Sequence, residues 1–151
     1  MVMNLNFTDL LNNHIIAVTM VSWLLAQSIK LIIDKIRYRE VDFTRIVGAG
    51  GMPSSHSAFV TSLATSIAFQ HGLDSTEFAL AFSLAAIVMY DAAGVRRSAG
   101  KQAKVLNKIV HDLYSKEHTI KKERLKELIG HSPVEVFAGA VLGILVAIFM
   151  A

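Results

Sequence analysis

The chain has 151 residues, of which 53% are hydrophobic, and its mean hydropathy is +0.47. That length suits one domain, but the composition is too apolar for an ordinary soluble domain, where about 45–50% of residues are apolar even with glycine counted. The formal charge of +3 is small, and the absence of cysteine excludes disulfides, a thiolate nucleophile and cysteine-based zinc sites.

Four apolar segments predict the architecture. A membrane-spanning helix needs about 20 mostly apolar residues, and the expected spans cover about 12–36, 54–71, 76–95 and 132–151. The second is short and rich in Ala, Ser and Thr, so a buried or partial span stays open. We expect an all-α integral membrane four-helix bundle in a single membrane domain over residues 1–151. The alternative is a soluble helical bundle with buried core helices.

The basic residues predict the orientation in the cell membrane. All 15 lysines and arginines fall within residues 30–45 or 96–126, and such residues concentrate in cytoplasmic loops. We therefore expect a multi-pass protein with both basic connections in the cytoplasm. Both termini and the HGLD turn between the second and third spans are then outside. The stretch MVMNLNFTDLLNNH has no basic residue and no cleavage site after it, so we expect no signal peptide.

The connection between the third and fourth spans, about residues 98–130, predicts amphipathic helices on the cytoplasmic side. The stretch KQAKVLNKIVHDL places Lys101, Lys104 and Lys108 on one helical face and apolar residues on the other. The stretch TIKKERLKELIG predicts a second amphipathic helix that ends at Gly130. Such helices either lie on an anionic leaflet or cover the end of the bundle, and the two are compatible.

The second span begins in the stretch GGMPSSHSAFV, residues 50–60. A glycine pair permits positive φ, a proline fixes a turn, and Ser54 or Ser55 can cap the helix. A capped helix start also binds anions, because its free N–H groups and the positive end of the helix dipole point outward. His56 lies next to this start. Taken alone, the pattern favours a capped helix start without a further role. The other helix ends decide whether this start also belongs to an anion-binding site.

The end of the first span carries two cations, Lys30 and Arg37. The end of the third carries Asp91 and, beyond it, the sequence GVRRSAGK. A carboxylate inside a span is costly, so we expect Asp91 to pair with one of the arginines that follow it. The basic residues of that sequence are Arg96, Arg97 and Lys101.

The fourth span begins GHSPVEVFAGAVLG, in which His131 and Glu135 are four residues apart and share a helix face. A carboxylate beside a histidine orients the ring and stabilises its positive form. Because all four helix ends meet at one membrane face, they predict a phosphoryl-transfer site: cations and N–H groups hold phosphate, and histidines serve as nucleophile and acid.

Each of these residues also has a purely structural interpretation. Lys30 can extend to the membrane interface, and Arg37 can be an ordinary cytoplasmic-side residue. His131 can simply precede a helix cap. A metal role for Asp91 with Glu135 is a weaker alternative.

The motifs resemble those of the type-2 phosphatidic acid phosphatase (PAP2) superfamily, which includes the vanadium haloperoxidases. That superfamily carries K-x6-R-P, then P-S-G-H, then S-R-x5-H-x3-D. Here Lys30-x6-Arg37 is followed by Tyr38, the PSSH stretch has Ser55 in place of glycine, and His131-x3-Glu135 has Glu in place of Asp. The arginine of the third motif is displaced, since 33 residues separate Arg97 from His131. The whole pattern looks like the divergent PAP2 branch.

The resemblance implies a role for each residue. His131 would be the nucleophile, His56 the general acid and Glu135 the residue that orients His131. Phosphate would be bound by the cations and the start of the second span, with Asp91 and Lys101 in support. The implied phosphate-binding residues are Lys30, Arg37, Ser54, Ser55, Arg96 and Arg97. No metal or other cofactor is implied, and vanadate is the expected inhibitor.

The favoured function is a membrane phosphatase, a PAP2-type acid phosphatase, that cleaves a phosphate monoester or pyrophosphate on a lipid through a phosphohistidine. The first alternative is a non-catalytic protein that binds or moves an anionic lipid headgroup. The second is a structural bundle whose basic helix recruits a cytoplasmic partner. Membrane lipids are the expected partners, with homo-oligomers open and no nucleic acid expected.

Overall fold

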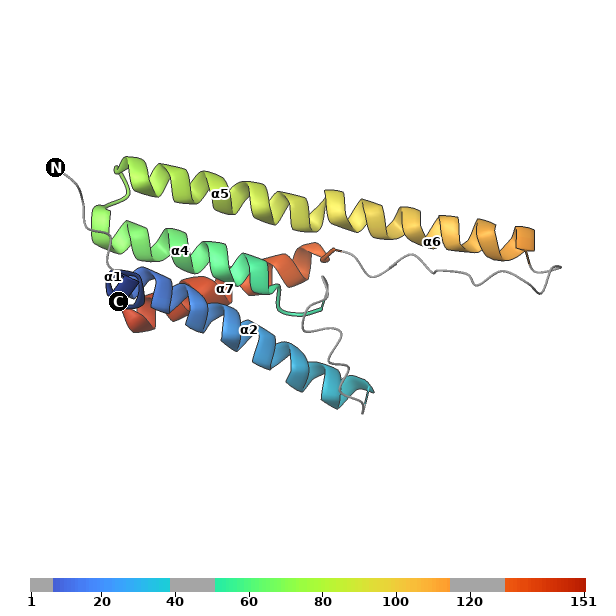
Figure 1. Cartoon of the computed structure of the whole chain (residues 1–151), viewed down its shortest axis with the longest axis horizontal. Helices are drawn as coiled ribbons and strands as arrows, with labels where there is room; N and C mark the ends of the chain where they lie inside the picture. The colour runs from blue at the N-terminus through green and yellow to red at the C-terminus, as the bar shows by residue number, and fades with distance from the viewer. Residues whose placement is uncertain (1–6, 39–50, 115–129) are drawn as a thin grey trace.

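The computed structural model describes residues 7–38, 51–114 and 130–151, and every regular element in these ranges is a helix. The expected all-α class is therefore confirmed. Helices α2, α4, α5 and α7 form a bundle, while α1 and α6 extend from it (Figure 1). The described helices are α1 (Phe7–Leu11), α2 (His14–Tyr38), α4 (Ser55–His71), α5 (Thr76–Ala93), α6 (Val95–Tyr114) and α7 (Pro133–Met150).

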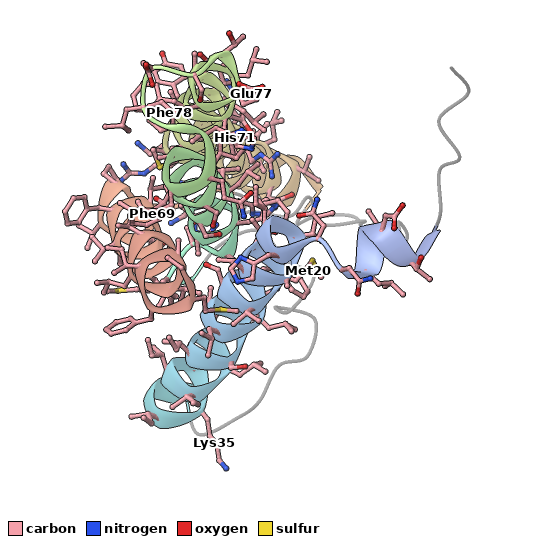
Figure 2. All side chains as sticks on the ribbon, turned by 90° about the vertical axis from the view of Figure 1, so that its left-hand side faces the viewer. Met20, Lys35, Phe69, His71, Glu77 and Phe78 are labelled. Atoms are coloured by element: carbon pink, nitrogen blue, oxygen red, sulfur yellow. The ribbon has the colours of Figure 1, made fainter. Side chains whose placement is uncertain are left out.

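Helix α4 is the centre of the bundle and packs against α2, α5 and α7. Figure 2, which looks along the bundle from the α4–α5 turn, shows α4 surrounded by these neighbours. The helix has buried residues all round, and they are small: Ala58, Ser62 and Ser66 are examples. Small side chains let helix backbones approach closely in a membrane. The Ala, Ser and Thr content of this segment therefore explains its central position.

Three described runs are long and apolar enough to cross a membrane: His14–Ile36, Thr76–Val110 and Pro133–Met150. Helix α4 is not among them. At 17 residues it is about 25 Å long, slightly less than the ~30 Å hydrocarbon layer of a bilayer. The single membrane domain over residues 1–151 stays a prediction.

The helix ends divide into two groups at opposite ends of the bundle (Figure 1). The C-terminus, α1 and the α4–α5 turn lie at one end. The end of α5 and the starts of α4 and α7 lie toward the other, as the expected topology requires. Helix α6 continues α5 nearly in line and extends past the bundle instead of folding across its end. The second amphipathic helix expected before Gly130 lies outside the described residues.

The closest helix contact is between α4 and α7, and two glycines of α7 make it. A Cβ added at Gly139 would collide with the carbonyl oxygen of Ser54, and one at Gly143 with Ala58 O and Thr61 Oγ1. The Thr61 hydroxyl also lies 3.1 Å from the carbonyl oxygen of Ala140 on α7. These contacts fix the position of α7 along the axis of α4. They therefore also fix the position of the first turn of α7.

Substituting Gly143→Ala separates two opposing effects. Helix propensity alone would stabilise the protein by about 1 kcal/mol, whereas the collision with α4 costs about 1–3 kcal/mol. Since the contacts of Gly143 are with backbone and a bonded hydroxyl, we expect the collision to win and the melting temperature in detergent to fall.

The control for this experiment is Ile144→Ala, which is on the same helix but exposed, and which we expect to change stability less. A Gly143→Ala protein that melts higher than the parent would show that α7 is not held against α4 as described.

Candidate functional site

The start of α7 brings His131 and Glu135 together. Ser132 is the N-cap, and its hydroxyl accepts a hydrogen bond from the N–H of Glu135. In return the Glu135 carboxylate accepts the N–H of Ser132 at 3.0 Å, which completes a capping box. The same oxygen, Oε2, lies 3.2 Å from Nδ1 of His131. One carboxylate therefore caps the helix and fixes the histidine ring.

His131 is buried, with 2% of its surface exposed. Burial lowers its pKa, and the nearby Lys30 lowers it further, while Glu135 and the Gly51 backbone act in the opposite direction. The ring is therefore neutral near pH 7. An acceptor at Nδ1 favours the tautomer with its proton there, which leaves a lone pair on Nε2. That nitrogen is buried and has no hydrogen-bond partner among the described residues.

The position of His131 is set from two sides. Its N–H donates to the carbonyl of Ala92 at the end of α5, at 3.0 Å. The preceding Gly130 has φ of +104°, and a Cβ there would collide with the backbone of Arg96 and Arg97. The backbone of Arg96 and Arg97 therefore lies next to the residue that precedes His131, although 33 residues separate Arg97 from His131 in the sequence.

The start of α4 is joined directly to the start of α7. Ser54, not Ser55, is the N-cap, and its hydroxyl accepts from the N–H of Ser57 at 3.3 Å. The N–H of Ser54 donates to the carbonyl of Glu135 at 2.9 Å. Ser54 and Ser55 are buried, whereas His56, the next residue, is exposed.

Lys30 is buried, with 2% of its surface exposed, near the end of α2. Its methylene chain lies against Gly51, which has φ of +89°, and a Cβ there would approach it to 3.2 Å. Its charge is within electrostatic range of Asp34 and Glu135. Asp34 is also buried and one turn along the same helix face. Asp34 was not among the predicted site residues, although its i, i+4 spacing to Lys30 was a signal.

Asp91 pairs with Arg96, whose Nε lies 2.5 Å from Oδ2 of the carboxylate. The expected partnership of Asp91 with an arginine therefore exists, and both side chains are partly exposed. Arg97 and Lys101 are exposed on α6. Arg37 belongs to the last turn of α2, but its side chain lies outside the described residues.

His56 lies near His131 and near two cationic side chains of the site. His56 is within electrostatic range of His131, Lys30, Arg96 and Asp91. These side chains come from α2, α4, α5, α6 and the residue that precedes the cap of α7.

A family model described as the divergent PAP2 family matches residues 11–146. The chain belongs to the divergent PAP2 family. This divergent PAP2 protein is also 43% identical, over 153 positions, to the uncharacterized membrane protein YuiD of Bacillus subtilis; the match covers 95% of this chain and 97% of the relative. The relative is named a membrane protein, and three described runs of this chain are long and apolar enough to cross a membrane, which is consistent with the expected multi-pass arrangement. No solved structure matches this chain significantly.

The lowered pKa of His131 predicts how stability depends on pH. The pKa of His131 is lower in the folded protein than the ordinary value of 6.5 that it has in the unfolded chain. At a pH between these two pKa values, the unfolded chain binds a proton at this histidine and the folded protein does not. The free energy of unfolding therefore falls as pH drops through this window, by at most about 1.4 kcal/mol per pH unit. The measurement is thermal unfolding in detergent between pH 7.5 and 5.

In His131→Gln this contribution to the pH slope disappears. The matched control is His71→Gln, because His71 is exposed at the other end of the bundle (Figure 2), and it should keep the parent slope. An undiminished slope in His131→Gln would contradict the neutral, buried state of this histidine.

Proposed function

We propose that this protein is an integral membrane phosphatase that hydrolyses a phosphate monoester or pyrophosphate on a lipid, through a phosphohistidine at His131. One observation carries the proposal. The buried His131 ring is held at Nδ1 by Glu135, so its free nitrogen, Nε2, is the one available for bonding. Lys30 and His56 are within electrostatic range of His131, and Arg96 is within electrostatic range of His56, so the groups that phosphoryl transfer requires lie in one region.

The first half-reaction follows from these positions. The lone pair of Nε2 attacks phosphorus, and the bond from phosphorus to the leaving oxygen breaks. That oxygen takes the proton of His56, while Glu135 stabilises the positive charge that His131 acquires. Lys30, Arg96 and the start of α4 hold the other phosphate oxygens, where negative charge is spread in the transition state.

The second half-reaction regenerates the site. His56, now neutral, takes a proton from water as the water oxygen attacks phosphorus and the bond from phosphorus to Nε2 breaks. Inorganic phosphate and neutral His131 result. We further propose that this face of the bundle is cytoplasmic, since the basic residues that flank it follow the positive-inside rule.

Access to Nε2 requires movement. The nitrogen is enclosed, and the Gly51 backbone lies near both the Lys30 chain and His131. A phosphate reaches Nε2 when the Lys30 chain or the Gly51 backbone moves aside. Lys30 then exchanges its contact with Gly51 for one with a phosphate oxygen.

The same enclosure favours one alternative, a non-catalytic protein that binds or moves an anionic lipid headgroup. Arg96 is already paired with Asp91, and Nε2 is closed off. A phosphate held by the cations without reaching Nε2 would be bound and not cleaved. In that case binding depends on Arg96 and not on His131.

Phosphate release from a panel of lipid and soluble phosphates tests the proposal with purified full-length protein. We expect His131→Ala to reduce turnover to background, since it removes the nucleophile, and His56→Ala to reduce it by about 10²–10⁴-fold as loss of a general acid does. His71→Ala, which is distant and exposed, should stay within about twofold of the parent.

Vanadate binding separates the two functions. The phosphatase loses much of its vanadate affinity in both His131→Ala and Arg96→Ala. Turnover that survives His131→Ala, or no turnover on any substrate of the panel, contradicts the phosphatase. Vanadate binding that survives His131→Ala but weakens in Arg96→Ala then supports the binding protein.

A further inference from the structure

An apolar groove of about 330 Å³ opens on the side of the bundle and reaches His56. Except for His56 itself, its lining is apolar or aromatic and comes from three helices. Met20 and Trp23 of α2 form one side, Val88 of α5 the other, and α4 lies between them. The lining residues are Met20, Trp23, His56, Phe59, Val60 and Val88.

The groove lies on the side of the bundle opposite α7. None of its lining residues belongs to α7, which packs against α2 and α4. Figure 2 shows Met20 on the side of α2 that faces away from α7. Trp23 and Val88 fall within two of the runs that are apolar enough to cross a membrane. With these helices in a membrane, the groove would therefore open toward the hydrocarbon of the bilayer.

The groove and the phosphate site share His56. In the proposed reaction His56 gives its proton to the leaving oxygen, so whatever that oxygen carries lies on the His56 side of the phosphorus. A polar leaving group would lose its water here without gaining hydrogen-bond partners from the lining. A hydrocarbon chain loses nothing and buries apolar surface.

We propose that this groove binds one hydrocarbon chain of the substrate, and that the chain belongs to the leaving group of the transferred phosphate. The substrate class is a single-chain lipid phosphate or pyrophosphate. The volume is near the lower limit of small-molecule sites, which run from about 300 to 1,000 Å³. It suits one chain and not two side by side. The assignment rests on the function proposed above, because that function fixes which side of the phosphorus faces His56.

Trp23 provides a test that does not depend on turnover, because it is the only tryptophan of the chain. The probe is dodecyl phosphate with bromine on its chain, added to full-length protein in detergent. His131→Ala protein is used so that the probe is not consumed. We expect saturable quenching of Trp23 fluorescence, with brominated dodecanol at least tenfold weaker since it lacks the phosphate. Equal quenching by both probes, or none, overturns the proposal.

A substitution that fills the groove tests the same assignment through kinetics. We expect Val88→Trp to lower kcat/KM for dodecyl phosphate at least tenfold and to leave ethyl phosphate within twofold. The matched control is Val141→Trp on α7, where the residue is 40% exposed and does not line the groove; it should change neither value. Equal effects on both substrates contradict the groove. If Val88→Trp changes the oligomeric mass of the protein, the groove is a contact between copies of the chain. That result also overturns the proposal.

The outcomes separate this proposal from the one on which it rests. Phosphate-dependent quenching without phosphate release by the parent protein keeps the groove as a chain-binding site, but rejects the phosphatase and with it the assignment of the chain to a leaving group. Phosphate release without quenching or chain-length preference keeps the phosphatase and rejects the groove. Comparing dodecyl phosphate with dodecyl pyrophosphate shows whether the chain is attached directly to the leaving oxygen or through a second phosphate.

Discussion

The hydrogen bond from the Ser54 N–H to the carbonyl of Glu135 joins the two helix starts from which the site is built. It forms only because Gly139 lets α7 approach the backbone of Ser54. Once it forms, the cap of α4, the cap of α7 and the orientation of His131 are all fixed relative to one another. Helix packing and site geometry are therefore one property of this molecule, and a change in either alters the other.

Three basic groups of the site share a second property: each has a carboxylate near it. Asp91 pairs with Arg96, Glu135 contacts His131, and Asp34 is one turn from Lys30. Buried charges are costly without such partners. The carboxylates therefore compensate the positive charges, and in the proposed function a phosphate would compete with them for the cations. In that function the affinity for phosphate would depend on this competition as well as on the number of cations.

Sequence patterns predicted the helical class and the grouping of helix ends, because apolar length and charge placement act locally. They also predicted that Asp91 has an arginine partner, since an unpaired charge in a span is costly. They did not decide between Ser54 and Ser55 as cap, because that choice depends on the contact with α7. The sequence patterns did not predict the groove at His56, because its lining comes from three helices. They also did not predict that α6 continues α5 nearly in line. Such features depend on tertiary packing, which spacing in one chain does not specify.

Gly130 lies against the backbone of Arg96 and Arg97, so the chain leaves the site and returns to it at nearly the same point. The ends of the intervening segment are thus held together by the site itself. Closing a longer loop between fixed ends adds little entropic cost, about 0.6 kcal/mol for each doubling of length. The bundle can therefore accept segments of very different size at this point, including a folded regulatory module, without moving His131 or its neighbours. An additional domain could therefore be inserted between Arg97 and Gly130.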